Sequence, residues 1–228
     1  MQRVGKGEPM SKRLRDNNQR TVADYERTAR EYVDTVDGSA SASDEALRRL
    51  AAALPPGARV LEVGSGPGWD ADRLEALGID VHRTDAAAAF CRFQAGRGKR
   101  CDRFDLLADR IDARHAGAMM LCVLQHFART ELLGALRKLA QALEPGAPLL
   151  LMYPEGDGEH TEHSAAGDYR VLRWMPAPFD AQLAQAGFSV AWEHTRPGRG
   201  GAWRTVLAAR GPGRSARLRE AVPRSPGE

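Results

Sequence analysis

The sequence predicts an α/β fold built on a doubly wound, mostly parallel sheet. Apolar strand patterns alternate with helical patterns from residue 58 onward, which is typical of parallel strands joined by helices. The segment LEVGSGPG at 61–68 joins the first of these strands to a helix through three glycines. The last two strands stand too close together for a parallel crossover, so we expect them to pair antiparallel.

Two helices precede the alternating part of the chain. The first is expected over 19–36, where Val22, Tyr25, Ala29, Tyr32 and Val33 share one face. A second helix is expected over 44–54, and it ends before Pro55-Pro56-Gly57. We interpret the region 19–54 as a helical cap.

Strands and helices then follow in turn. Strands are expected at 58–63, 79–84, 101–104, 117–123 and 147–153, and again at 187–194 and 202–209. Helices are expected at 68–77, 86–97, 128–143 and 178–186. A polar loop at 154–170 follows the fifth strand, so that 154–176 is expected to border the substrate.

Composition limits the class of protein. A chain of 228 residues, 43% hydrophobic and 28% charged, fits one soluble domain, which we place at 19–210. Apolar runs fall short of the roughly 20 residues of a membrane span, and three cysteines without a CxxC pair suit a reducing cytoplasm. We therefore expect a cytoplasmic protein with no membrane partner, as a monomer or a homodimer.

Both ends of the chain are basic. Residues 1–20 hold six basic and two acidic side chains, and 211–228 hold four and two. We interpret 1–18 and 211–228 as flexible solvated tails. The body has no interleaved patch of aromatic and basic residues, so a nucleic-acid partner is not expected.

Three acidic residues end three neighbouring strands. Glu62 closes the first, Asp85 the second, and Asp105 follows the third. The carboxyl ends of parallel strands meet at the ligand-binding rim of such sheets. A single aspartate after a strand is often a helix cap, but three behind a glycine turn predict a ligand site.

The spacing of the turn separates two nucleoside ligands. A dinucleotide site uses GxGxxG and leaves room for a pyrophosphate, whereas this chain has GxGxG with an acid two positions ahead. An acid at that place suits a cationic ligand. S-adenosylmethionine carries a ribose, a sulfonium and an ammonium but no phosphate. Asp85 follows the glycine turn at a spacing in the sequence that is typical of a ribose-binding carboxylate.

The chain resembles the class I S-adenosylmethionine-dependent methyltransferases, whose Rossmann-like sheet has seven strands with the last one antiparallel. The resemblance covers about residues 20–210. VLEVGSGPG at 60–68 matches the first family motif, and HRTDAAAAF at 82–90 and RFDLLAD at 103–109 resemble the ribose and adenine segments. MLCVLQHF at 120–127 and LEPGAPLLLMYPEGDGE at 143–159 resemble the fourth and fifth strands.

The resemblance implies roles for residues that would bind S-adenosyl-L-methionine. Glu62 orders the turn, Asp85 holds the ribose, and Asp105 with Leu106 recognises adenine. Leu121 or Cys122 offers a carbonyl near the ammonium. Tyr25 and Tyr32 close over the cofactor or belong to the core. The cofactor-binding residues implied are Tyr25, Tyr32, Glu62, Gly64, Ser65, Gly66, Gly68, Asp85, Asp105, Leu106 and Leu121.

The acceptor side is predicted from titratable groups near the fourth and fifth strands. His126 leaves the fourth strand, and Glu155, Asp157 and His160 lie in an acidic, histidine-rich loop. This loop either borders the acceptor or is solvated. We name His126, Glu155 and Asp157 as catalytic candidates. Candidates for substrate binding are Tyr32, His126, Tyr153, His160, Arg173 and Trp174.

Arg170, Arg173 and Trp174 would favour an anionic or aromatic acceptor, while Trp174 fits the core equally well. His160 and His163 with acidic neighbours have the chemistry of metal ligands, but the pair alone does not specify a site, so no metal is expected.

The leading hypothesis is a methyltransferase that acts on a nitrogen or oxygen atom of a small molecule, such as a natural product or peptide. One alternative is a catalytically silent S-adenosylmethionine-binding or regulatory protein. The other is an NAD-dependent oxidoreductase, which the turn spacing disfavours.

Overall fold

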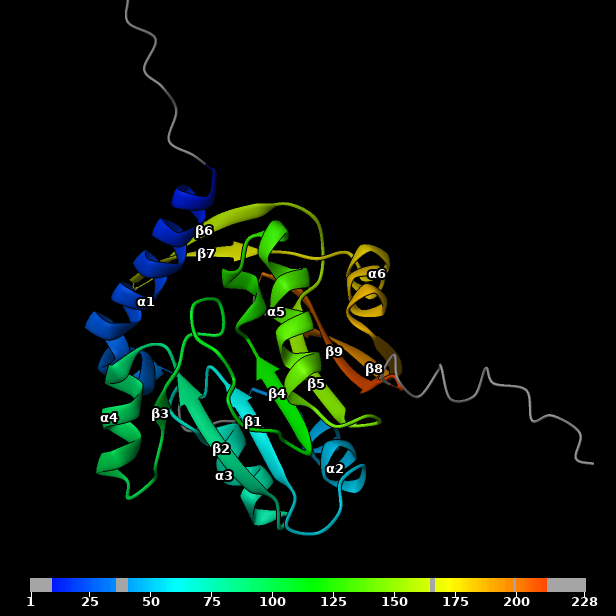
Figure 1. Cartoon of the computed structure of the whole chain (residues 1–228). Coiled ribbons are helices and arrows are strands. Elements are labelled where there is room, and N and C mark those ends of the chain that lie inside the picture. Colours follow the sequence, from blue (N-terminus) through cyan, green and yellow to red (C-terminus); the bar gives the residue numbers. More distant parts are fainter. Residues whose placement is uncertain (1–9, 36–40, 165–166, 199, 213–228) are drawn as a thin grey trace, which may run out of the picture.

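The computed structural model describes residues 10–35, 41–164, 167–198 and 200–212. A seven-stranded sheet forms its centre, in the order β3-β2-β1-β4-β5-β9-β8, and helices cover both faces (Figure 1). Neighbouring strands from β3 to β5 pair parallel, and β9 runs antiparallel to both β5 and β8. The predicted fold class is therefore confirmed.

The elements keep the predicted order. The helices are α1 (Met10–Thr35), α2 (Asp44–Ala52), α3 (Trp69–Ala76), α4 (Ala88–Gly96), the short 3₁₀ helix η1 (Leu124–His126), α5 (Arg129–Ala142) and α6 (Pro176–Ala186). The strands are β1 (Arg59–Val63), β2 (Asp80–Asp85), β3 (Asp102–Arg103), β4 (Gly117–Leu121), β5 (Pro148–Pro154), β6 (Glu159–Ser164), β7 (Gly167–Leu172), β8 (Phe188–Gly198) and β9 (Gly201–Arg210).

The core has two layers because strand residues alternate between the two faces of the sheet. Leu61 and Met120 face α5 and α6 in one apolar cluster. Val60 and Met119, one position earlier, face α2 and α3 in the other. Strands β4 and β5 are buried along their whole length, which explains their unbroken apolar sequence.

The N-terminal region differs from the expected cap. Helix α1 begins at Met10, so the flexible tail predicted over 1–18 is too long; residues 1–9 lie outside the described residues. The sequence from 10 to 18 is rich in charged helix formers, and its charges hid the helix from a search for apolar periodicity. Helix α2 belongs to the core layer beside α3, so only α1 serves as a cap.

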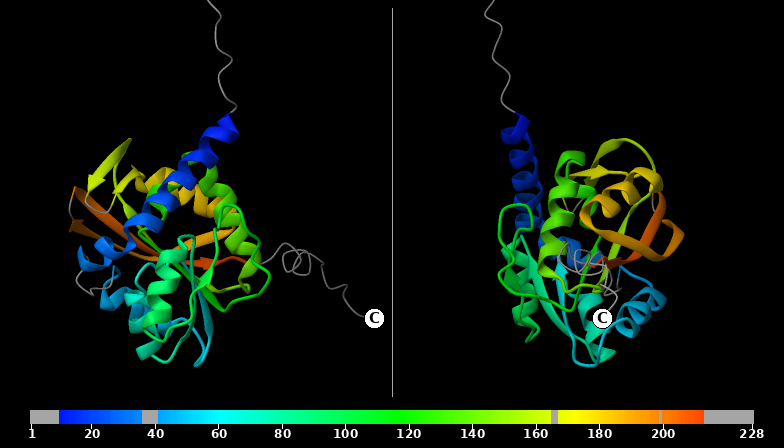
Figure 2. Two further views of the ribbon diagram at one scale, coloured as in Figure 1. Left: turned by 90° about the vertical axis from the view of Figure 1, so that its left-hand side faces the viewer. Right: turned by 45° about the vertical axis from the view of Figure 1, so that its right-hand side comes forward.

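The segment 154–170 is not a loop as predicted. Strands β6 and β7 form a separate antiparallel hairpin, with His160 opposite Val171. The hairpin lies beyond the end of the main sheet and reaches α1 (Figure 2). Its sequence is polar, which fits a two-stranded ribbon with exposed sides. A search for alternating apolar residues therefore does not detect these strands. The tail predicted at 211–228 lies outside the described residues from 213 onward.

Two strand ends also differ from expectation. Strand β4 stops at Leu121 rather than at 123, because Cys122 adopts a positive φ of 57° that breaks the extended backbone. Strands β8 and β9 run past the predicted ends, to Gly198 and from Gly201, so their hairpin reaches farther.

Candidate functional site

Close packing requires glycine at two of the three glycine positions in the turn after β1. Gly64 has a φ of +71°, and a Cβ there would lie 2.3 Å from a methyl group of Val123. Gly68 has a φ of +87°, and its Cβ would lie 2.6 Å from a nitrogen of Arg83. Gly66 has a φ of +53° with open space around it. The turn thus packs tightly on its inner side and leaves Gly66 facing the cavity.

A buried polar network supports the turn from behind. The fully buried Gln94 donates hydrogen bonds to the Ser65 hydroxyl (3.0 Å) and to the Gly66 carbonyl (2.8 Å). Arg83, also buried, donates to Gln94 (3.1 Å) and forms ion pairs with Asp72 (2.8 Å) and Glu75 (2.7 Å). Sequence reasoning missed Arg83 and Gln94, because their role depends on α4 packing beside β2.

Asp85 is buried at the end of β2 and holds the turn directly. Its two carboxylate oxygens accept the backbone N–H groups of Gly66 and Ala87, each at 2.8 Å. Burial outweighs these bonds and raises the pKa of Asp85 to about 6. Each oxygen keeps a further lone pair with which it can accept a ligand hydroxyl.

Glu62 has an unused acceptor in the buried wall. Its side chain is only 4% exposed, and its Oε2 has no hydrogen-bond partner among the described residues. Burial raises the pKa of Glu62 to about 8. A buried carboxylate oxygen without a partner is costly, so this position fits a ligand that brings a cation or a donor.

Asp105 completes the acidic rim. Its side chain accepts hydrogen bonds from the Asn18 amide (2.8 Å) and from the Leu107 N–H (2.9 Å). The first bond ties the rim to α1. Asp70, at the start of α3, is also buried in this wall and accepts the N–H groups of Ser41 and Ala42.

These residues surround one cavity of about 590 Å³. Its size is within the usual range of small-molecule pockets. The predicted site residues that line it are Tyr25, Tyr32, Glu62, Gly64, Ser65, Gly66, Asp85, Asp105, Leu106, Leu121 and His126. Gly68 does not line it and instead begins α3. The cavity therefore brings together most of the positions expected to bind the cofactor.

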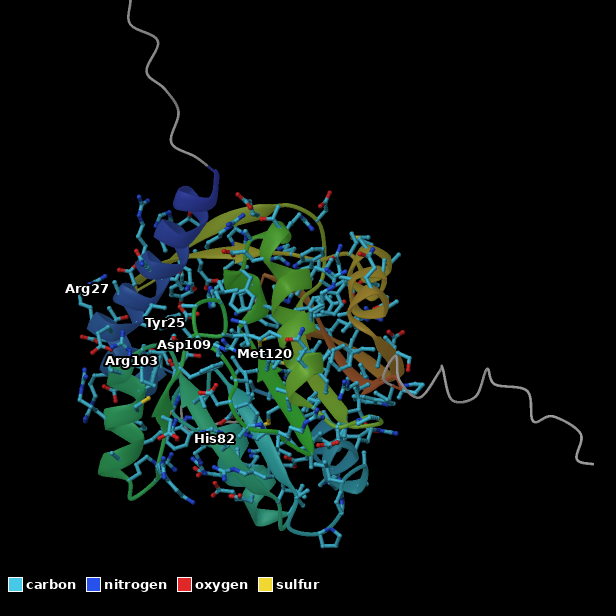
Figure 3. All side chains as sticks on the ribbon, viewed as in Figure 1. Tyr25, Arg27, His82, Arg103, Asp109 and Met120 are labelled. Carbon is cyan, nitrogen blue, oxygen red and sulfur yellow. The ribbon has the colours of Figure 1, made fainter. Side chains whose placement is uncertain are left out.

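An aromatic cluster closes the cavity beneath α1. Tyr25 stacks on Tyr169 of β7 at 5.2 Å between ring centroids, and lies 5.7 Å from Tyr32 and 5.8 Å from Phe90. Figure 3 shows Tyr25 directed from α1 toward the sheet, whereas Arg27 points away. The two predicted tyrosines thus form the inner face of the cap.

His126 links the cap to the sheet. Its Nδ1 lies 2.9 Å from the Arg170 carbonyl, which can only accept, so Nδ1 donates there. Nε2 lies 3.3 Å from the Tyr25 hydroxyl and therefore accepts from it. Burial lowers the pKa of His126 to about 4, so the ring is neutral at physiological pH. Its Nε2 lone pair is directed at the Tyr25 hydroxyl.

The end of β4 carries local strain. Cys122 is the one non-glycine residue with positive φ among the described residues, and it lines the cavity. A left-handed residue of this kind costs about 1–2 kcal/mol. Gln125 donates a 2.6 Å hydrogen bond to the Cys122 carbonyl, so that acceptor is already engaged. Such strain is common where backbone is shaped around a ligand.

A family model described as a methyltransferase domain matches residues 31–192. The chain belongs to the methyltransferase domain family. The match covers the glycine turn, the acidic rim and His126. No curated protein matches the chain by sequence.

Solved structures show the same fold. The DhpI–S-adenosylhomocysteine complex is 21% identical with a TM-score of 0.66, over 86% of this chain and 98% of that one. The 1,6-didemethyltoxoflavin-N1-methyltransferase of Burkholderia thailandensis, with bound 1,6-didemethyltoxoflavin and S-adenosylhomocysteine, is 19% identical with a TM-score of 0.65, over 92% and 94%. The glycopeptide N-methyltransferase MtfA, complexed with sinefungin, is 17% identical with a TM-score of 0.60, over 77% and 89%.

Two aromatic residues predicted to touch substrate lie in the core of this methyltransferase. Tyr153 is fully buried, with its ring 4.1 Å from that of Phe179 and its hydroxyl accepting from Arg204 at 2.7 Å. Trp174 is buried against Phe179, beneath the guanidinium of Arg129. The prediction for Tyr153 is wrong, because β5 is buried along its whole length and α6 covers the ring, and of the two places left open for Trp174 the structure shows the core.

The charged residues of 155–173 lie outside the cavity of the methyltransferase. Asp157 is 87% exposed and pairs with Arg129. Glu155 accepts from Thr195, and Arg173 donates to the carbonyls of Glu155 and Gly200. His160 is exposed on β6. These side chains make local contacts or face solvent, so Glu155, Asp157, His160 and Arg173 are not at the site, whereas the predicted Tyr32 and His126 line the cavity.

Several lining residues of the methyltransferase were not anticipated. Met152, Arg196 and Trp203 form the wall farthest along the sheet from β2 and β3, and Ser41 lies between Arg196 and Asp70. They come from three distant segments, since Arg196 and Trp203 belong to one hairpin, so no local pattern in the sequence points to the whole wall. Among the described residues, no three His, Cys, Asp or Glu side chains gather as a metal site requires. No helix in the described part of the chain is long and apolar enough to cross a membrane.

Proposed function

We propose that the protein transfers a methyl group from S-adenosylmethionine to a nitrogen or oxygen atom of a small molecule. The observation that carries the donor is the acidic wall of the cavity. Glu62, Asp70 and Asp85 are buried there, and Glu62 has an oxygen without a partner. A cationic nucleoside fits this wall, whereas the phosphates of NAD would be repelled.

Residues of this chain have distinct tasks in the proposal. The backbone of Gly64 and Gly66 receives the amino-acid part of the donor, beside Glu62. Asp85 accepts the ribose hydroxyls, and Asp105 with Leu106 contacts the adenine. When bound, S-adenosylmethionine supplies a methyl group activated on a sulfonium. The protein contributes chiefly by positioning the acceptor for in-line attack.

His126 and Tyr25 offer a route for the acceptor proton. Neutral His126 has its Nε2 lone pair toward the Tyr25 hydroxyl, which lines the cavity. An acceptor that donates to Tyr25 could pass its proton toward His126 as its nucleophile is methylated. An amine that binds in its neutral form, or a phenol, fits this arrangement.

The comparisons support the same class of acceptor. Two structural neighbours are described as N-methyltransferases, one of 1,6-didemethyltoxoflavin and one of glycopeptides. Small natural products and peptides are therefore the first acceptors to examine. We propose a cytoplasmic protein that works as a monomer or a homodimer, without a nucleic-acid or membrane partner.

Calorimetric titration tests the donor, and turnover tests the activity. We expect S-adenosylmethionine and S-adenosylhomocysteine to bind and NAD not to bind. Binding of NAD without S-adenosylmethionine would overturn the proposal. Formation of S-adenosylhomocysteine on an acceptor panel would separate an enzyme from a silent binding protein.

A further inference from the structure

The charges around the cavity are divided between its two ends. Of the lining acids, Glu62, Asp85 and Asp105 come from β1, β2 and the segment after β3. Asp70 of α3 lies nearer to Arg196, since its carboxylate accepts the Ser41 N–H while Arg196 donates to the Ser41 carbonyl. Arg196 comes from β8 at the opposite edge of the sheet, and it is the one lysine or arginine among the described lining residues. One end of the cavity therefore suits a cation and the other an anion.

Arg196 is held in place but keeps donors available. Its Nη2 donates to the Ser41 carbonyl at 2.7 Å and lies 4.0 Å from the sulfur of Met152. No described carboxylate forms an ion pair with it, and the described hydrogen bonds engage Nη2 alone. A guanidinium has five N–H donors arranged to bind an oxyanion through two of them. The remaining donors of Arg196 are suited to such a ligand.

Trp203 places a flat apolar surface next to this cation. It stands directly opposite Arg196 in the β8–β9 pairing, so both side chains lie on the same face of the hairpin and both line the cavity. Gly198 packs against the indole, since a Cβ there would lie 2.4 Å from the Trp203 ring. This close contact fixes the ring beside the guanidinium.

We propose that the methyl acceptor is a planar, usually aromatic, molecule carrying an oxyanion such as a carboxylate, which pairs with Arg196 while its flat face packs on Trp203. This inference rests on the proposed function and specifies the substrate class of the same site. It also transfers the predicted preference for an anionic or aromatic acceptor from Arg173 and Trp174 to Arg196 and Trp203. The anion would anchor the acceptor at the far wall and direct its nucleophile toward the donor.

Matched ligands test the proposal. The probes are planar aromatic amines and phenols, each offered as its carboxylate and as its primary carboxamide, to protein saturated with S-adenosylhomocysteine. We expect the carboxylates to bind roughly tenfold tighter than their amides. With S-adenosylmethionine, the same preference should be found in KM rather than in kcat.

Variants identify the residue responsible. Arg196→Gln should abolish the preference for carboxylates, and Arg196→Lys should retain part of it. Arg49→Gln removes the same charge from an exposed side chain of α2 outside the cavity and should retain the full preference. Trp203→Leu should weaken carboxylates and carboxamides equally. Thermal unfolding of each variant verifies that the fold persists.

Two results would overturn the inference. One is a panel in which carboxylates and carboxamides bind alike, or in which neither form binds. The other is that Arg196→Gln weakens the binding of S-adenosylhomocysteine as much as it weakens the binding of the carboxylate probes. That result would assign Arg196 to the carboxylate of the donor. If the wild-type protein still binds S-adenosylhomocysteine, either result overturns this inference and leaves the proposed donor site standing.

A second inference concerns Cys91 of α4 and Cys101, which directly precedes β3. Their sulfurs lie 3.1 Å apart, and both side chains are partly exposed. The contact between the two thiols lowers the pKa of Cys91 and raises that of Cys101. Sequence spacing gave no sign of this pair, because nine residues separate the two cysteines.

We infer that Cys91 and Cys101 form a reversible dithiol site that small disulfides such as oxidised glutathione convert to a disulfide. The Cys91 thiolate attacks the glutathione disulfide and releases one glutathione thiolate. Cys101 then loses its proton and attacks the Cys91 sulfur, releasing the second glutathione. The protein gives up two electrons, and the glutathione disulfide is reduced to two thiols.

Thiol titration and intact mass after exposure to oxidised glutathione test this step. Wild type and Cys122→Ser should each lose two thiols without retaining glutathione. Cys101→Ser should instead accumulate protein with glutathione on Cys91. Retention of all three thiols in wild type, or stable glutathione on Cys91 with Cys101 present, would overturn the inference.

Discussion

The two ends of the cavity are built in different ways. At the donor end, Glu62, Gly64, Gly66 and Asp85 come from two adjacent strands and one short turn, and backbone hydrogen bonds tie them together. At the acceptor end, the residues come from three distant segments: Ser41, Met152, and the β8–β9 hairpin with Arg196 and Trp203. The donor end is therefore a local structure, whereas the acceptor end exists only once the whole sheet has formed.

The largest effect is expected from a substitution at Gly64, where the donor end is most tightly packed. Gly64→Ala should destabilise the protein by about 3 kcal/mol, because it adds left-handed strain to a clash with Val123. Gly66→Ala is the matched control, since it has a similar φ but open space, and should cost about 1 kcal/mol. Chemical denaturation measures both, and equal losses would contradict the packing argument.

Asp85→Ala should weaken S-adenosylhomocysteine binding by about 2–3 kcal/mol, through loss of charge-assisted hydrogen bonds. The Gly66 N–H also loses its acceptor, so the turn should loosen. Asp80→Ala, at the exposed first residue of β2, serves as the control. If calorimetry finds unchanged affinity in Asp85→Ala, the ribose has been placed wrongly.

Substitutions of His126 and Tyr25 test the proposed route for the acceptor proton. His126→Ala should leave S-adenosylhomocysteine affinity intact and lower kcat by roughly 100-fold, the scale of general-base catalysis. Tyr25→Phe, which keeps the ring and removes the hydroxyl, should lower kcat in the same direction. Unaffected turnover in both variants would assign this pair to packing alone.

His126 also predicts a pH dependence of stability. Its folded pKa of about 4 lies below the usual 6.5, so the unfolded chain binds the extra proton. Its contribution is present above pH 6.5 and is lost as the pH falls toward 4. The stability gap between wild type and His126→Asn should narrow across that window; a gap that stays constant would contradict a buried neutral ring.

Glu62 gives a smaller effect that is specific to the donor end. Its pKa of about 8 means that the free protein holds a proton there at pH 7. A cationic ligand favours the carboxylate, so binding of S-adenosylmethionine should release close to one proton and strengthen as pH rises toward 8. Calorimetry in buffers of different ionisation enthalpy counts this proton, and Glu62→Gln should eliminate its release.

The smallest effects are expected outside the cavity. Glu155→Gln, Asp157→Asn and His160→Ala should each change kcat/KM by less than a factor of about two, since surface changes typically fall within ±0.5 kcal/mol. Steady-state kinetics measures them. A large loss in any of the three would restore the predicted role of the 154–170 segment.

The same contrast explains what the sequence could predict. The order of strands and the acidic rim follow from periodicity and from the glycine turn, because each depends on neighbouring residues. The support by Arg83 and Gln94, the β6–β7 hairpin and the wall at Arg196 depend on contacts between distant elements. Tyr153 is misplaced, and Trp174 is left undecided, for the same reason: the sequence near a strand end is the same whether an aromatic residue faces the core or the ligand.

A structure with S-adenosylhomocysteine bound tests the division of the cavity most directly. Our account predicts the ribose on Asp85, the adenine beside Asp105 and the amino-acid part near Glu62, with Arg196 and Trp203 left open for an acceptor. A ligand whose carboxylate lies on Arg196, or whose ribose lies away from Asp85, would contradict it.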